Sequence, residues 1–78
     1  MEYHDYLGFR IVPHPLKLVE GGFNCQIFIE KHSGSEITSR KFSASNTFAT
    51  RDEALRRCVE FGVRVIDGDV EGCTVSDL

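Results

Sequence analysis

The chain has 78 residues, of which 41% are hydrophobic and 27% charged, and its formal net charge is −3. A chain of this length encloses one small core and covers only about 60–65% of the surface that it exposes when unfolded. The composition excludes intrinsically disordered and fibrous proteins, and no apolar run approaches the roughly 18 residues that span a bilayer. The N-terminus lacks the basic and apolar regions of a signal peptide, so we expect a cytoplasmic protein.

Acidic side chains gather toward the C-terminus. Residues 67–78 contain four acidic residues and no basic one, which leaves the rest of the chain nearly neutral. Nonspecific nucleic-acid binding depends on phosphate neutralisation and counterion release, and this charge balance disfavours it. The sequence shows no repeat, low-complexity tract or linker, so we expect a single domain over residues 1–78, with a core at about 6–68 and an acidic tail at 69–78.

The first predicted strand is residues 9–12, Phe-Arg-Ile-Val, which follow a polar, aromatic lead-in at residues 1–7. Pro13 and Pro15 come directly after it. Because proline cannot donate to a strand ladder, we expect this strand to lie at a sheet edge or to stop there. A Glu-Gly-Gly turn at residues 20–22 then leads into the next strand.

Residues 23–31 show the clearest alternation in the chain and predict a second strand with one buried face. The expected core positions on this face are Phe23, Cys25, Ile27 and Ile29. Phe28 is the exception, because it is a large apolar side chain on the polar side of the strand. It is either exposed, as an interface residue would be, or covered by Tyr3, Tyr6 or the tail as part of a second small core.

A Ser-Gly-Ser turn at residues 33–35 predicts that residues 37–42 form a third strand, paired with the second as a hairpin. Arg40 and Phe42 share one face of this strand, since side chains alternate with a period of two. Burying Phe42 in the core would therefore also turn Arg40 inward, unless a bulge intervenes.

The helix is the best-defined element of the sequence. Thr50 and Glu53 fit a capping box, in which the Thr hydroxyl and the Glu carboxylate each satisfy a free backbone N–H, so the helix should begin at Arg51. Apolar residues recur at helical spacing as far as Ile66, and Gly68 supplies a C-terminal stop.

Together these elements predict an α+β fold, with a three-stranded antiparallel sheet packed by one C-terminal amphipathic helix. Residues 70–75 are compatible with a short extra strand or with a docked tail, and we expect residues 76–78 to fray.

The cysteines are odd in number and far apart, without a Cys-x-x-Cys pair, so we expect reduced thiols. Cys25 lies on the predicted core face of the second strand, and Cys58 lies on the apolar stripe of the helix. Both should behave as small buried hydrophobic residues. Cys73, in the acidic tail, is the thiol that we expect to be exposed.

The sequence contains no recognisable constellation for catalysis or metal binding. His4, His14 and His32 lack the spacing of metal ligands, and the acidic residues of the tail lack the twelve-residue pattern of a calcium loop. We find no phosphate-binding loop, Ser–His–Asp set or paired catalytic carboxylates. The expectation is a non-enzymatic protein with no catalytic residue, no cofactor and no metal.

Two surfaces remain as candidate binding sites. The first is the polar face of the sheet, which would contact a protein partner or a second copy of the chain through Arg10, Gln26, Phe28 and Arg40. The second is a basic patch for phosphate groups, built from Arg40, Lys41, Arg56 and Arg57, which would serve a nucleic-acid-binding regulator. Phe28 is the only plausible exposed stacking residue, and this disfavours binding of single-stranded nucleic acid.

Several turns, strand starts and the helix cap together resemble a known family. The motifs are Tyr6-x-Gly8-Phe9-Arg10-Ile11-x-Pro13-x-Pro15, Glu20-Gly21-Gly22, Ile29-Glu30-Lys31, Phe42, Thr47-Phe48, Arg51-Asp52-Glu53-Ala54 and Ile66-Asp67. Over roughly residues 6–67 the chain is similar to the small HlyU-type family of bacterial proteins, described as transcriptional regulators, and to related conserved hypothetical domains.

The resemblance implies a cytoplasmic bacterial protein linked to gene regulation, and it carries no catalytic residues. The chain departs from the family pattern at Ser43, Ala44 and Ser45, where family members are more basic, and in its acidic tail with Cys73. These departures weigh against a DNA-binding role. The leading hypothesis is a small regulatory or binding module that contacts a protein partner.

Overall fold

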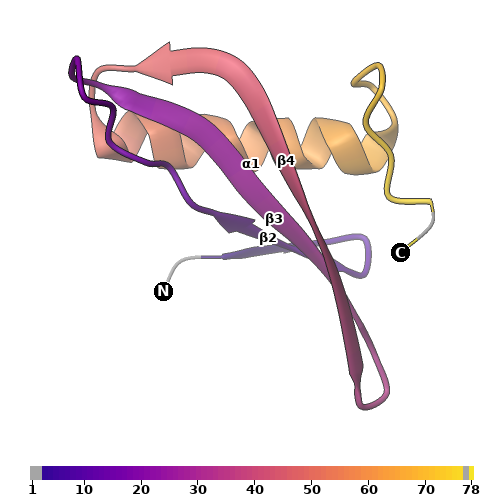
Figure 1. The fold of residues 1–78 in the computed structure, drawn as a ribbon. Helices are drawn as coiled ribbons and strands as arrows, with labels where there is room; N and C mark the ends of the chain where they lie inside the picture. The colour runs from indigo at the N-terminus through magenta and orange to yellow at the C-terminus, as the bar shows by residue number, and fades with distance from the viewer. Residues whose placement is uncertain (1–2, 77) are drawn as a thin grey trace.

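The structure of the protein is a computed structural model that describes residues 3–76 and 78. Its elements are β1 His4–Tyr6, β2 Phe9–Pro13, β3 Phe23–Ser33, β4 Glu36–Phe48 and α1 Arg51–Asp67. The four strands form one antiparallel sheet in the order β1-β2-β3-β4, and α1 packs across one face of it (Figure 1). The predicted α+β class, with an antiparallel sheet packed against one helix, is confirmed.

The prediction of three strands is wrong, because the sheet has four. The additional strand, β1, forms from residues of the polar lead-in and pairs with β2, with Tyr6 opposite Phe9. Only Leu7 and Gly8 connect the two strands, and both have positive φ angles, 49° and 83°. This backbone suits the right-handed twist of a two-residue hairpin, which explains why so short and polar a segment pairs here.

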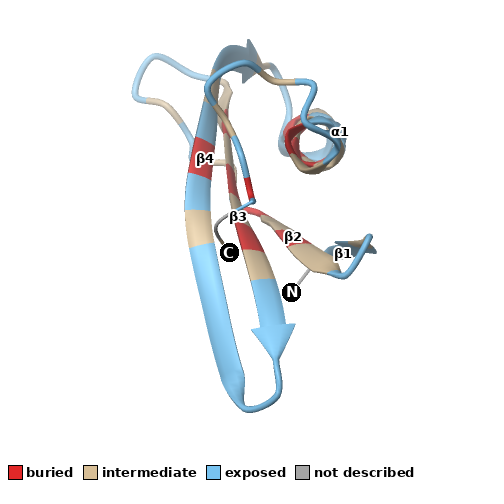
Figure 2. Ribbon diagram, turned by 90° about the vertical axis from the view of Figure 1, so that its right-hand side faces the viewer, coloured by how far each residue is buried: buried red, intermediate tan, exposed pale blue. Residues whose placement is uncertain are grey.

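Strands β3 and β4 run further than the sequence predicted, and their hairpin projects beyond the helix as a two-stranded ribbon (Figures 1 and 2). Every residue from 31 to 39 is exposed. At its other end β4 continues to Phe48, after an irregularity at which Cys25 pairs with Ala44 but Asn24 pairs with Thr47. Two residues of β4 therefore bulge out of the ladder between these pairs.

The core lies between α1 and the sheet face that carries the odd-numbered positions of β3, as expected (Figure 2). Its fully buried sheet side chains include Ile11, Ile27 and Ile29. From the helix, Cys58 and Val65 complete it, and Gly62 allows the helix backbone to approach Ile11 closely.

The helix begins at Arg51 as predicted, with Thr50 as its N-cap. The Glu53 N–H donates to the Thr50 hydroxyl oxygen at 3.2 Å, which satisfies one of the free donors of the first turn. Gly68 ends the helix in the left-handed conformation, at a φ of 82°. Arg57 pairs with Glu60 at 3.2 Å, three residues along the helix, rather than with Glu53 four residues before it.

The tail docks on the core and forms no strand within its described residues. Val75 is buried in the core between sheet and helix, and Val70 and Leu78 pack against the same cluster. The Leu78 N–H donates to the Val75 carbonyl at 3.1 Å. Asp77, part of the predicted acidic tail, lies outside the described residues. Across the part of the chain that the structure covers, no helix has the length and hydrophobicity that a bilayer span requires.

Candidate functional site

The sheet face opposite α1, here called the outer face, carries the first candidate surface. Strand register assigns to it Arg10, Val12, Gln26, Phe28, Glu30, Ser39, Lys41 and Ser43. Neither α1 nor the docked tail lies over this face, because both pack on the opposite side of the sheet (Figure 2). These side chains are half-buried or exposed.

Phe28 lies at the centre of a cross-strand row on the outer face. Val12 is directly opposite it on β2, and Lys41 is directly opposite it on β4. The His14 ring lies 6.1 Å from the Phe28 ring, centroid to centroid, and is tilted by 58°. Phe28 is half-buried, so this row forms a small apolar centre rather than a closed core.

The side chains of Tyr3 and Tyr6 do not build a second core over Phe28. The Tyr6 hydroxyl reaches the helix side of the sheet, where it donates to Asp67 Oδ1 at 2.8 Å. Tyr3 instead lies against Arg10, with the guanidinium carbon 4.0 Å from the ring centroid. The described tail residues pack on the helix side as well, so neither they nor the two tyrosines bury Phe28, which stays half-buried.

Arg10 is held in a defined position on this face. Its Nε donates to Asp5 Oδ1 at 2.9 Å, while the Tyr3 ring lies against the guanidinium. The hydrogen bond to Arg10 lowers the pKa of Asp5 from its usual value, and the same bond raises the pKa of Arg10. Arg10 is therefore a preorganised polar group whose charge is already paired.

The structure brings together three of the four predicted partner-binding residues, Arg10, Gln26 and Phe28, but not Arg40. Arg40 pairs with Ile29, so it lies on the helix side of the sheet. The bulge that could have turned it outward lies beyond Phe42, between Ala44 and Thr47, and does not affect it. Burial of Phe42 thus does turn Arg40 inward, at a level of the sheet where the position is only half-buried.

The four residues of the predicted basic patch lie on separate surfaces. Arg40 is on the helix side of β4, whereas its neighbour Lys41 is on the outer face. Arg56 and Arg57 are exposed on α1, and Arg57 is paired with Glu60. No single contiguous patch unites the four.

Two of the cysteines touch each other inside the core, which the sequence alone did not reveal. Cys58 is fully buried, Cys25 is 2% exposed, and their sulfur atoms lie 3.4 Å apart. Burial raises the pKa of Cys25 to about 12, with a further contribution from the Cys58 thiol. Both are free thiols, as predicted, and Cys73 is the more accessible one.

The three histidines lie at separate places, two of them in the sheet and one directly after β2. His4 is on β1, His14 follows β2 beside Phe28, and His32 is near the tip of the β3–β4 hairpin. His32 Nε2 is 3.0 Å from Glu30 Oε1. Among residues 3–76 and 78, no three His, Cys, Asp or Glu side chains converge in an arrangement that could hold a metal ion.

Val12 and His14 belong to the outer-face centre, although the sequence did not mark them as site residues. The available signal was the strand register, because antiparallel pairing of residues 9–13 with residues 27–31 places Val12 opposite Phe28.

Comparison with known proteins finds no relative of the chain: no family model, curated protein or solved structure matches it.

Proposed function

We propose that this protein is a small, non-enzymatic binding module that contacts a protein partner through the outer face of its sheet. The observation that carries the proposal is the position of Phe28, a half-buried aromatic side chain at the centre of a sheet face on which no helix or strand of the described residues packs. Binding energy at protein interfaces concentrates in such aromatic anchors, surrounded by polar groups that exclude water.

The residues around Phe28 support this proposal. Val12 and His14 extend its apolar centre, while Gln26, Arg10 and Lys41 supply polar groups around it. Covering Phe28 with a partner would remove its remaining apolar surface from water, and full burial of such a side chain contributes about 1.5–3 kcal/mol. Arg10 needs little ordering on binding because Asp5 and Tyr3 already hold it.

A nucleic-acid-binding regulator is the alternative that the resemblance to the HlyU-type family raises. The separation of Arg40, Lys41, Arg56 and Arg57 over different surfaces weighs against it, since a phosphate backbone is bound by a contiguous set of cations. We expect duplex DNA binding weaker than about micromolar at physiological salt. Sub-micromolar, steeply salt-dependent binding that Arg40→Ala with Lys41→Ala abolishes would favour the alternative.

The outer-face proposal is tested with Phe28→Ser. The matched control is Val19→Ser, which removes an apolar side chain that is fully exposed in a loop. We expect both variants to keep a melting temperature close to that of the wild type, and only Phe28→Ser to lose self-association in sedimentation velocity or capture of a partner from a bacterial lysate. A large drop in melting temperature for Phe28→Ser, with association and capture unchanged, would assign Phe28 to folding and overturn the proposal.

A further inference from the structure

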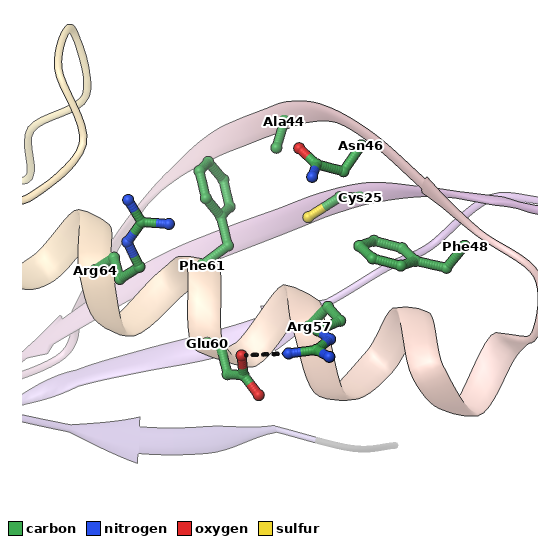
Figure 3. A pocket seen from close by; sticks show the side chains of 8 residues that line it. All are labelled: Cys25, Ala44, Asn46, Phe48, Arg57, Glu60, Phe61 and Arg64. Atoms are coloured by element: carbon green, nitrogen blue, oxygen red, sulfur yellow. Dashed lines mark hydrogen bonds and ion pairs between the residues drawn. The ribbon is translucent and has the colours of Figure 1, made fainter.

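A groove opens on the helix side of the sheet, between α1 and β4 (Figure 3). It exists because α1 packs chiefly over β2 and β3, with Gly62 against Ile11 and Cys58 against Cys25. The edge strand β4 extends beyond the cover of the helix. The groove has a volume of about 400 Å³, within the range of roughly 300–1,000 Å³ that small-molecule sites occupy.

The lining of this groove is apolar at its base and aromatic on both sides. Cys25 and Ala44, which pair across β3 and β4, form the base. Phe48 extends from β4 and Phe61 from α1, and their rings flank the space above Cys25 (Figure 3). Aromatic rings prefer offset or edge-to-face contact with other rings, so two phenyl walls favour a planar aromatic ligand over a branched aliphatic one.

The polar groups at the rim favour an anion. Arg64 extends from α1 beside Phe61, and Asn46 extends from β4 on the other side (Figure 3). Within residues 3–76 and 78, neither side chain has a hydrogen bond or ion pair to a protein group. The remaining charges, Arg57 and Glu60, neutralise each other at 3.2 Å. The net charge offered to a ligand is therefore the guanidinium of Arg64.

We propose that the groove between α1 and β4 binds a small planar aromatic carboxylate. The ring lies between Phe48 and Phe61, and the carboxylate pairs with the Arg64 guanidinium, whose planar fork matches the two carboxylate oxygens. The Asn46 amide donates a hydrogen bond from the opposite side of the rim. This site lies on the other side of the sheet from Phe28 and does not depend on the outer-face proposal.

The test uses 2-naphthoate as the probe, titrated into the whole chain and followed by amide chemical shifts. We expect saturable shifts centred on Ala44, Phe48, Phe61 and Arg64, with a dissociation constant of about 1 mM or tighter, the range typical of a ligand with few atoms. The uncharged analogue 2-naphthalenemethanol should bind about ten-fold more weakly, because it lacks the partner of the guanidinium.

Two variants and a control locate the interaction. Arg64→Gln should weaken 2-naphthoate binding about ten-fold and remove the preference over the uncharged analogue. Ala44→Leu should abolish binding of both probes by filling the base of the groove. Arg56→Gln, which removes an equal charge from an exposed helix position outside the groove, should change neither.

The proposal fails if 2-naphthoate produces no saturable shifts up to 10 times the expected constant, roughly 10 mM. It also fails if Arg64→Gln and Arg56→Gln weaken binding equally, which would indicate attraction to general positive charge. Shifts centred on Val12 and Phe28 would place the ring on the outer face and equally overturn the assignment. Melting curves of the variants show whether any loss of binding comes from unfolding.

Discussion

At Gly62 the helix backbone lies close against Ile11 of the sheet. A β-carbon at this position would lie 2.6 Å from Ile11 Cγ2 and 3.0 Å from Ile11 Cδ1. Gly62→Ala should therefore destabilise the protein by about 1–2 kcal/mol in urea unfolding, because overpacking outweighs the gain of about 1 kcal/mol in helix propensity.

Combining Gly62→Ala with Ile11→Ala checks the cause. The double variant should lose less stability than the two single variants added together, since removing the Ile11 side chain makes room for the new methyl group. A Gly62→Ala protein more stable than the wild type would show that the helix can shift outward at little cost.

The cysteines give a second test at the scale of single residues. Cys25 and Cys58 are buried against each other, and burial raises the pKa of Cys25 to about 12, so its thiolate is scarce at pH 8. In the native protein, a thiol reagent at pH 8 should label Cys73 first. In the Cys73→Ser variant, labelling should proceed only as fast as the core opens, and rapid labelling of Cys58 would contradict its place in the core.

At the scale of elements, the helix depends on its N-cap. Thr50→Ala removes the oxygen that accepts the Glu53 N–H and should cost about 0.5–2 kcal/mol of stability, measured by urea unfolding. Thr50→Ser, which keeps the hydroxyl, should retain most of the stability that Thr50→Ala loses. As a control, Thr38→Ala on the exposed hairpin should stay within about 0.5 kcal/mol of the wild type, and an equal loss there would remove the special role of Thr50.

In the turn between β1 and β2, by contrast, we expect a substitution to stabilise the protein. Leu7 is 69% exposed and has a φ of 49°, a left-handed conformation that costs energy for a residue of this kind. Leu7→Asn should stabilise the protein by about 0.5–1 kcal/mol, because Asn-Gly is the preferred pair for such a turn. Leu7→Ala should bring no such gain, and a gain as large as that of Leu7→Asn would point to the loss of exposed apolar surface instead.

These two elements also show what sequence reasoning can reach. The start of α1 was predictable because its cap, its apolar period and its terminal Gly68 are all local signals. Strand β1 was missed because its three residues have no apolar alternation, and it forms only through pairing with β2. Leu7 and Gly8 both have positive φ angles, as the central residues of such a hairpin turn require. The pair Leu-Gly predicts this turn far less clearly than Asn-Gly would.

The candidate surfaces divide in the same way. The sequence identified Phe28 by its conflict with the alternation of β3. It also indicated that Arg40 shares a face with Phe42 and turns inward with it unless a bulge intervenes. It could not locate the bulge, which depends on how β4 curves around the core, nor the contact between Cys25 and Cys58, which are 33 residues apart. Both require the packing of one element on another.

At the scale of the whole molecule, one sheet separates two different surfaces. The helix side buries the core, the two thiols and the docked tail, and it leaves the groove beside β4. Within residues 3–76 and 78, no helix or strand packs on the outer face, which presents Phe28 among polar groups. A protein partner on one side and a small anion on the other would thus be separated by the thickness of the sheet, so each proposal can fail without the other.

The projecting end of the β3–β4 hairpin has a further consequence for the molecule. Its residues 32 to 37 lie beyond the last pair between β2 and β3 and are all exposed, and a two-stranded ribbon is only marginally stable without a third strand or a helix packed on it. Amide hydrogens there should exchange with solvent by local opening, well before those of Ile27 or Cys58, which exchange only when the core unfolds. For the same reason, a foreign peptide inserted next to Gly34, at the tip, would be displayed on the end of the ribbon without disturbing the core that supports it.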